Sequence, residues 1–140
     1  LAGIIATAKA LEVTDSTRVS ECERVSVMRD RLVDEIRAAL DGVLETVPRQ
    51  HRVPGAAHLC FSGVENEALL FLLDQVDVCA SAASACASGA MEPSHVLEAM
   101  GVERSWSNGA LRLSLGHTTT NADIDKAVSA IVSAVNQLRR

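Results

Sequence analysis

Aromatic side chains are scarce in this sequence of 140 residues, which contains two Phe, one Trp and no Tyr. Proteins that bind single-stranded nucleic acids stack the bases on aromatic rings and hold the backbone in a basic groove. The basic groove is lacking as well, because the formal net charge is −5 and the densest basic cluster is Arg139–Arg140 at the C-terminal end. We therefore expect no nucleic-acid partner.

Lysine is scarce too, since only Lys9 and Lys126 are lysines among the 13 basic residues. Any reaction that needs a lysine amine has these two candidates. Lys9 lies in a helical pattern at the start of the chain, with no glycine-rich turn or hydroxyl-bearing motif around it. Lys126 follows Asp125 in the last predicted helix, where an exposed surface lysine is the expected role.

The sequence has no C-x-x-C pair, because Cys22, Cys60, Cys79 and Cys86 are all far apart in the chain. This spacing gives no support for a zinc or iron–sulfur site, and the four histidines add no metal-binding pattern. A chain of this size can build a core without disulfides. We expect no resident metal, a reducing cytoplasmic location, and small core residues at all these cysteines except Cys86.

No apolar run has the length of a membrane span. The longest, Ala68–Ala80, is interrupted by Asp74, Gln75 and Asp77, whereas a transmembrane helix needs about 20 apolar residues. The chain starts at Leu1 in the middle of a helical pattern, without an N-cap residue or an initiator Met. We expect from this start that the sequence was cut from a longer chain, and we identify no targeting segment and no membrane partner.

What is present is the composition of one globular domain, with 48% hydrophobic and 22% charged residues. Apolar positions recur every three or four residues through Val25–Val43, which predicts a long helix with one buried stripe. The same pattern in Ile124–Leu138 predicts a final helix, preceded by Thr120 and Asp123 at the spacing of a capping box.

Shorter elements are predicted between these two helices. In the first half of the chain we expect a helix at about 2–11, a polar N-cap cluster at 14–16, the long helix to about 44 and a connector at 48–54. The second half should contain a strand at 58–61, a helix at 65–73, a strand at 76–81 and a helix at 93–100 that stops at Gly101. A loop around Trp106, a strand at 110–115 and the final helix follow. This order favours an α/β (α+β) fold. We expect a small mixed sheet of about three to four strands, covered on one face by helices and preceded by a long N-terminal helix; strand directions are not readable from the pattern.

Cys86 lies in a run of small residues, SAASACASGA (81–90), between a predicted strand and a predicted helix. Such runs form exposed, mobile loops, which is where a nucleophilic thiol must be if it is to move to a substrate. A run of Ala and Ser can also pack tightly, with Cys86 as one more small buried residue. Composition alone leaves both interpretations open.

Four motifs resemble one family. SAASACASG (81–89), EPSHVL (92–97), LRLSLGHTTT (111–120) and FSGVENEALL (61–70) are similar to the C-terminal part of the pyridoxal-phosphate-dependent cysteine desulfurases. These enzymes belong to the class V aminotransferase family with fold type I, and the resemblance is narrowest to the group that matures iron–sulfur clusters and nitrogenase. The departures are Ala82–Ala83, where the family has Ser-Gly, and His117, where it has Arg.

The resemblance implies roles for two residues. Cys86 would be the mobile-loop thiol that accepts sulfur from cysteine as a persulfide, with alanine as the other product. Arg112 would hold the substrate carboxylate in a two-pronged ion pair, which suits a planar guanidinium on a strand. Position alone would also allow Arg112 to be an exposed strand residue paired with a carboxylate of the protein.

The same resemblance implies pyridoxal phosphate as the cofactor of the parent enzyme, held by a lysine upstream. Because Lys9 and Lys126 lack the surroundings of a cofactor lysine, we expect no cofactor bound to this chain alone. Residues 1–50 would then link to the missing cofactor domain, and residues 51–140 would form the small C-terminal domain. The implied partners are L-cysteine, an iron–sulfur scaffold or other sulfur-acceptor protein, and a second copy in a homodimer.

We therefore expect this chain to be part of a cysteine desulfurase that serves iron–sulfur cluster assembly, and to be inactive when isolated. The alternative is a stand-alone, non-catalytic module that carries a persulfide on Cys86 or only docks to a partner. A simple thiol oxidoreductase is disfavoured, because no resolving cysteine lies at short spacing from Cys86.

Overall fold

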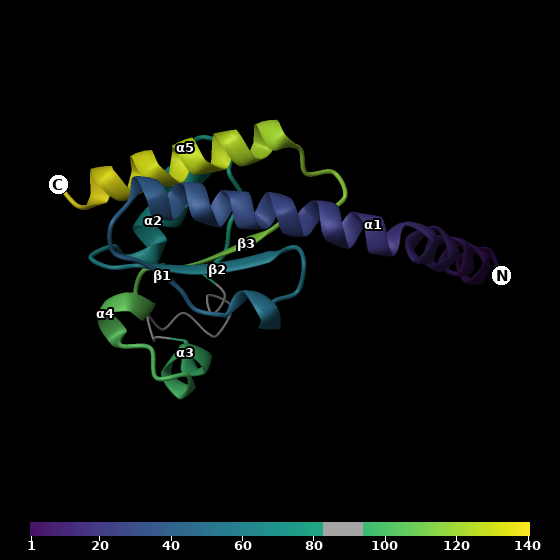
Figure 1. Ribbon diagram of the computed structural model, residues 1–140, viewed down its shortest axis with the longest axis horizontal. Helices are drawn as coiled ribbons and strands as arrows, with labels where there is room; N and C mark the ends of the chain where they lie inside the picture. The colour runs from purple at the N-terminus through teal and green to yellow at the C-terminus, as the bar shows by residue number, and fades with distance from the viewer. Residues whose placement is uncertain (83–93) are drawn as a thin grey trace.

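The computed structural model describes residues 1–82 and 94–140 of the chain (Figure 1). Its elements are α1 (Ala2–Ala39), β1 (Val43–Glu45), a 3-10 helix (Arg49–His51), β2 (Ala56–Phe61), α2 (Asn66–Asp74), α3 (His95–Ala99), α4 (Arg104–Ser107), β3 (Ala110–Ser114) and α5 (Asn121–Leu138). None of the described helices is both long and apolar enough to cross a membrane.

The sheet has three strands in the order β1-β2-β3. Both pairs are antiparallel, with Val43 opposite Phe61 in one and Cys60 opposite Ala110 in the other. The predicted strand number is confirmed, but the expectation of a mixed sheet is wrong for the described residues. The connection between β1 and β2 is short, and a short connection allows only antiparallel pairing because parallel strands need a crossover of a dozen or more residues.

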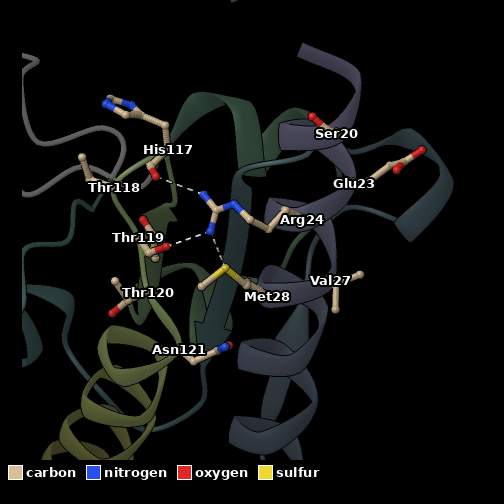
Figure 2. Close-up of a pocket in the computed structure, with 10 residues that line it drawn as sticks. All are labelled: Ser20, Glu23, Arg24, Val27, Met28, His117, Thr118, Thr119, Thr120 and Asn121. Atoms are coloured by element: carbon tan, nitrogen blue, oxygen red, sulfur yellow. Dashed lines mark hydrogen bonds between the residues drawn. The ribbon is translucent and has the colours of Figure 1, made fainter. Parts of the chain in front are cut away.

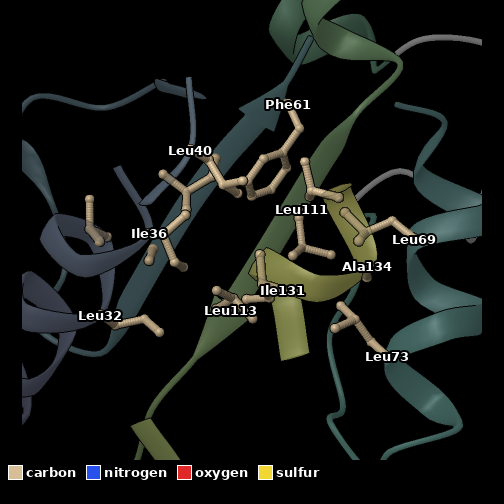
Figure 3. Packing of buried hydrophobic residues seen from close by; sticks show 14 of the residues in the cluster. Leu32, Ile36, Leu40, Phe61, Leu69, Leu73, Leu111, Leu113, Ile131 and Ala134 are labelled. Atoms are coloured by element: carbon tan, nitrogen blue, oxygen red, sulfur yellow. The ribbon is translucent and has the colours of Figure 1, made fainter. Parts of the chain in front are cut away.

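One face of the sheet carries the core. Alternate residues of the strands, including Phe61 and Leu111, point toward α1, α2 and α5 (Figure 3), as expected for a sheet with helices on one face. The second half of α1 lies beside α5 on this face (Figure 1). Fully buried members of the core are Val33, Ile36, Leu59, Phe61, Leu69, Leu73, Leu111, Ile131 and Val135.

The opposite face is partly covered as well. Cys60 and Ala110 project to this side and pack with Leu97 of α3, and Trp106 of α4 packs against the same cluster. The sequence predicted a loop around Trp106 and missed α4, whose four residues are too few to show a period. Among the described residues, the helical cover therefore extends over one end of the second face and not over the other.

The first helix is continuous over 38 residues, so the predicted break at Thr14–Ser16 is wrong. The Oγ of Ser16 donates a hydrogen bond to the carbonyl of Val13 within the helix, at 2.8 Å. A hydroxyl that could cap the start of a new helix forms a hydrogen bond within α1 instead. Residues 1–20 are exposed, and this half of α1 projects away from the sheet (Figure 1).

The end of α1 also differs from the prediction. The helix stops at Ala39, Leu40 is extended, and Gly42 turns the chain with a φ of +62°. Val43–Glu45 then forms β1, which the sequence placed in the helix. Val43 satisfies both patterns, because it continues the apolar stripe of α1 and also packs against the core from β1.

The predicted strand at 76–81 is not formed. Asp77 has a φ of +55°, and the N–H of Val78 donates to the carbonyl of Leu73 at 3.0 Å. This is the geometry of a helix C-terminus that ends with a left-handed residue. Of the predicted strand only Ser81 pairs, through an isolated bridge to Arg112.

The predicted cap of the final helix is confirmed. Thr120 accepts a hydrogen bond from the backbone N–H of Asp123, and the Asp123 carboxylate accepts one from the backbone N–H of Thr120. Gly101 follows α3 with a φ of +76°, as the predicted stop requires.

Candidate functional site

Arg112 lies in the middle of β3 on the face opposite the core. Its neighbours Leu111 and Leu113 are buried among the helices, and side chains alternate along a strand, so Arg112 projects to the other face. Its side chain is exposed. The strand therefore holds a guanidinium at the open end of that face.

The backbone of Arg112 is held on its outer side by Ser81. The N–H of Arg112 donates to the carbonyl of Ser81 at 2.6 Å, and the N–H of Ser81 donates to the carbonyl of Arg112 at 3.1 Å. Ala82 is buried. Cys86 and the rest of residues 83–93 lie outside the described residues, so the structure fixes only the point from which the chain continues toward Cys86.

Within residues 1–82 and 94–140, the Arg112 guanidinium forms no ion pair and no hydrogen bond. Other arginines of the chain are paired: Arg31 with Glu35 and Asp125, for example, and Arg52 with Glu45. The alternative in which Arg112 is neutralised by a carboxylate of the protein therefore finds no support among the described residues. Among residues 1–82 and 94–140, nothing occupies the guanidinium.

His58 is the residue directly opposite Arg112 on β2. Its imidazole is half-buried, and Nδ1 lies 2.9 Å from the Thr46 hydroxyl. Burial, together with the charge of Arg112, holds the pKa of His58 below its ordinary value. Sequence patterns do not connect His58 with Arg112, because the pairing of these two residues depends on the strand register. Only the alignment of β2 with β3 shows it.

The described thiols are poor candidates for a nucleophile in this site. Cys60 lies two residues from His58 on the same face, but it is fully buried, and burial raises the pKa of its thiol to about 11. Cys79 is exposed but lines a pocket with Leu113 and Lys126, on the helix side of the sheet. No group of three or more His, Cys, Asp or Glu in the described parts of the chain could hold a metal.

Residues 1–127 match the family described as Aminotransferase class-V. This chain belongs to that family. Over its whole length it is 40% identical to an IscS-like cysteine desulfurase of Mycobacterium tuberculosis, and over 98% of its length it is 38% identical to the cysteine desulfurase IscS of Anaeromyxobacter. The matches cover 36% and 33% of those proteins, so the chain spans about a third of their length.

Solved structures show the same fold. A NifS-like protein matches 96% of this class-V aminotransferase chain with a TM-score of 0.81 at 24% identity, and a NifS-like protein from Rickettsia africae matches 86% with a TM-score of 0.70 at 21% identity. The matches cover 33% and 31% of those chains. The long helix, the small sheet and the final helix are thus arranged as in NifS-like proteins.

Class-V aminotransferases depend in general on pyridoxal phosphate, which needs a lysine for its Schiff base. Lys9 lies in the projecting half of α1, 66% exposed, and its Nζ is paired with Glu12 at 3.1 Å. Lys126 is exposed on α5, on the helix side of the sheet. Because neither amine lies on the face of Arg112, the described residues of this chain do not fit the cofactor.

A pocket of about 730 Å³ lies where the segment after β3 meets α1. Figure 2 shows Arg24 of α1 reaching into it toward the carbonyls of His117 and Thr119 and the Sδ of Met28. Arg24 also pairs with Glu21, and this bond holds the pKa of Glu21 below its usual range. These contacts fasten the segment after Arg112 to α1, including His117, the residue that departs from the family motif.

Proposed function

We propose that this chain is the C-terminal part of a cysteine desulfurase, in which Cys86 accepts sulfur and Arg112 binds the carboxylate of the substrate. One observation carries the proposal. The Arg112 guanidinium stands on the open face of the sheet without a partner among the described residues, and its backbone is bonded to Ser81, five residues before Cys86. The curated relatives named above as cysteine desulfurases support the same function.

Sulfur transfer needs a nucleophilic thiolate and an electron sink for the substrate carbon, which pyridoxal phosphate would supply in the parent protein. The Cys86 thiolate attacks the sulfur of L-cysteine and forms an S–S bond while the C–S bond of the substrate breaks. The substrate carbon keeps the electron pair and takes a proton, which gives L-alanine. Cys86 is left as a persulfide, with the sulfur ready for an acceptor.

Arg112 orients the substrate for this attack. A guanidinium donates two parallel hydrogen bonds to a carboxylate and so fixes its plane as well as its position. The strand below it is rigid, since β3 pairs with β2 on one side and with Ser81 on the other. This combination limits rotation of a small amino acid, which holds its sulfur in one place.

The remaining parts of the reaction belong to the parent protein. We place the cofactor and its lysine there, with residues 1–50 as the link and residues 51–140 as the small domain. The persulfide sulfur would pass to an iron–sulfur scaffold or another acceptor protein in the cytoplasm. A homodimer of the parent protein is the assembly we propose.

The test uses the full-length protein that carries this chain, incubated with L-cysteine. Mass spectrometry should find one additional sulfur atom on the peptide of Cys86, and L-alanine should accumulate. Cys86→Ser should abolish both, whereas Cys79→Ser, a matched change at an exposed thiol, should leave both intact. Alanine formation at the normal rate by Cys86→Ser would overturn the role of Cys86.

An experiment with the isolated chain distinguishes a stand-alone persulfide carrier from a part of the desulfurase. The isolated chain should form no alanine from cysteine. If it acquires sulfur on Cys86 only when a separate full-length desulfurase is added, the chain is a persulfide carrier rather than part of the enzyme.

A further inference from the structure

His58 and Arg112 form a close cross-strand pair. They are exact partners in the β2–β3 register. The backbone N–H and C=O of Arg112 both bond to Ser81, away from β2. Since the two groups of one strand residue point to the same side, the pair is of the non-hydrogen-bonded type, in which the Cα atoms approach to about 4.5 Å and the side chains are closest.

Thr46 holds the imidazole beside Arg112. Its hydroxyl lies 2.9 Å from Nδ1 of His58, and its backbone N–H donates to the carbonyl of His58 at 3.3 Å. With Nδ1 occupied by the hydroxyl, Nε2 is the ring atom left for another partner. Among the described residues, no hydrogen bond to Nε2 is formed.

Among the described residues, Arg112 is the principal charge that faces His58. The same face of the sheet carries no charged group besides Arg112 among the described strand residues. It consists of Leu44 of β1, Thr46 just after β1, Ala56 and Cys60 of β2, and Ala110 and Ser114 of β3. Glu45 lies on the other face, where it pairs with Arg52 and Arg37. The charged groups of the helices beside this face, His95 and Glu98 of α3 and Arg104 of α4, are exposed.

This arrangement couples protonation of His58 to occupation of Arg112. A bare guanidinium beside a half-buried imidazole disfavours a second positive charge, and the lowered pKa of His58 agrees. A carboxylate on Arg112 cancels the guanidinium charge and places a negative group next to the ring. The imidazolium is then the favoured form.

We propose that His58 is the second carboxylate-binding group of the Arg112 site: it is neutral while the site is empty, takes a proton from water when a carboxylate binds, and stabilises that carboxylate with a second positive charge. This inference rests on the proposed role of Arg112 as the carboxylate clamp. The affinity for the substrate should therefore increase as the pH falls. The preference for amino acids over amines that lack a carboxylate, such as cysteamine, should increase with it.

The test is a histidine titration of the 140-residue chain by NMR, with L-alanine as the carboxylate probe. In the free chain the His58 ring should titrate below the ordinary pKa of a histidine. At saturating L-alanine the pKa of His58 should rise by about one unit, the shift expected for an anion placed within contact distance. His51 should not move, and the His58 shift should vanish in Arg112→Gln.

The affinity for L-alanine gives the matching measurement. By linkage, the wild-type Kd should fall about five- to sevenfold from pH 8 to pH 5.5. His58→Asn should show a change of less than about twofold over this range, and His51→Asn should behave as wild type. The wild-type titration needs no substitution, so it decides the question even if a variant is unstable.

The outcomes separate the two proposals. If L-alanine does not bind, or binds equally to Arg112→Gln, the role of Arg112 fails and the inference falls with it. If binding requires Arg112 but the pKa of His58 and the slope of Kd with pH stay unchanged, the inference about His58 alone is overturned.

Discussion

Ser81 and Arg112 exchange two backbone hydrogen bonds, with N···O distances of 3.1 and 2.6 Å. The bridge ties the segment before Cys86 to the strand that carries the guanidinium. The bridge therefore limits how far Cys86 can lie from a substrate held on Arg112. The five residues from Ser81 to Cys86 span at most about 18 Å when the chain is fully extended.

Arg112→Lys should weaken substrate binding while it keeps the positive charge. An ammonium cannot donate the two parallel hydrogen bonds of a guanidinium, and a lost hydrogen bond to a charged group corresponds to about 10- to 100-fold. We expect kcat/KM for L-cysteine to fall by this factor in the full-length protein. Arg104→Lys is the matched control, since Arg104 is exposed on α4; an equal loss in both variants would contradict a specific role of Arg112.

Gly109→Ala should destabilise the fold. A Cβ at Gly109 would lie 2.1 Å from the carbonyl oxygen of Phe61 and 3.0 Å from that of Val64, so the backbone has to shift. We expect the free energy of unfolding in urea to fall by about 1–3 kcal/mol. At Gly116 a Cβ meets nothing within 4 Å, so Gly116→Ala should change it by less than about 0.5 kcal/mol.

Cys60 should resist alkylation in the folded protein. Its pKa of about 11 leaves a thiolate fraction of about 0.1% at pH 8, and the side chain is fully buried. Iodoacetamide should therefore label the exposed Cys79 first and label Cys60 only in urea, as read by peptide mass spectrometry. Native labelling of both at one rate would show that β2 is open at this position.

The capping box of α5 should give the chain an acid-dependent stability. Hydrogen bonds from Thr120 hold the pKa of Asp123 below its ordinary value. The ionised carboxylate thus adds stability above its ordinary pKa, of about 4, and loses it as the pH falls through the lowered pKa of the folded state. The urea midpoint of wild type should exceed that of Asp123→Asn at pH 6, and this difference should disappear toward pH 2.5.

Two further variants check this interpretation of the cap. Thr120→Ala removes the hydroxyl that caps the helix and should cost about 1 kcal/mol at pH 6. Asp15→Asn changes an exposed carboxylate of α1, paired with Arg18 at 3.7 Å, and should leave the pH profile of stability unchanged. If the stability of Asp123→Asn changed with pH in the same way as that of wild type, Asp123 would not contribute to the acid dependence of stability.

The sequence predicted those parts of the fold that depend on local patterns. The stripe of α5 and its cap were visible because apolar spacing and the Thr120–Asp123 pair act within a few residues. Residues 76–81 have the apolar composition of a strand. Asp77 nevertheless adopts a left-handed conformation, and this segment forms the C-terminal turn after α2. The apolar composition of residues 76–81 indicates that some of them pack against the core. Their backbone conformation depends instead on the end of α2, where Leu73 is buried in the core.

The candidate site was predictable only in part for the same reason. Arg112 could be found because its motif is contiguous in sequence. His58 could not, because its relation to Arg112 is a register between strands separated by α2, α3 and α4. The position of Cys86 relative to Arg112 lies outside the described residues and stays a prediction.

The projecting half of α1 is a helical arm that continues directly into the core of the domain. Residues 1–20 continue, without a break in the helix, the segment whose Val33 and Ile36 are completely buried, and at 1.5 Å per residue this arm is about 30 Å long. A tilt of about 5° at its base moves the tip by about 2.6 Å over that length. A force on the tip would therefore act as a torque on the sheet, and would turn the face that bears Arg112 as one piece with the arm.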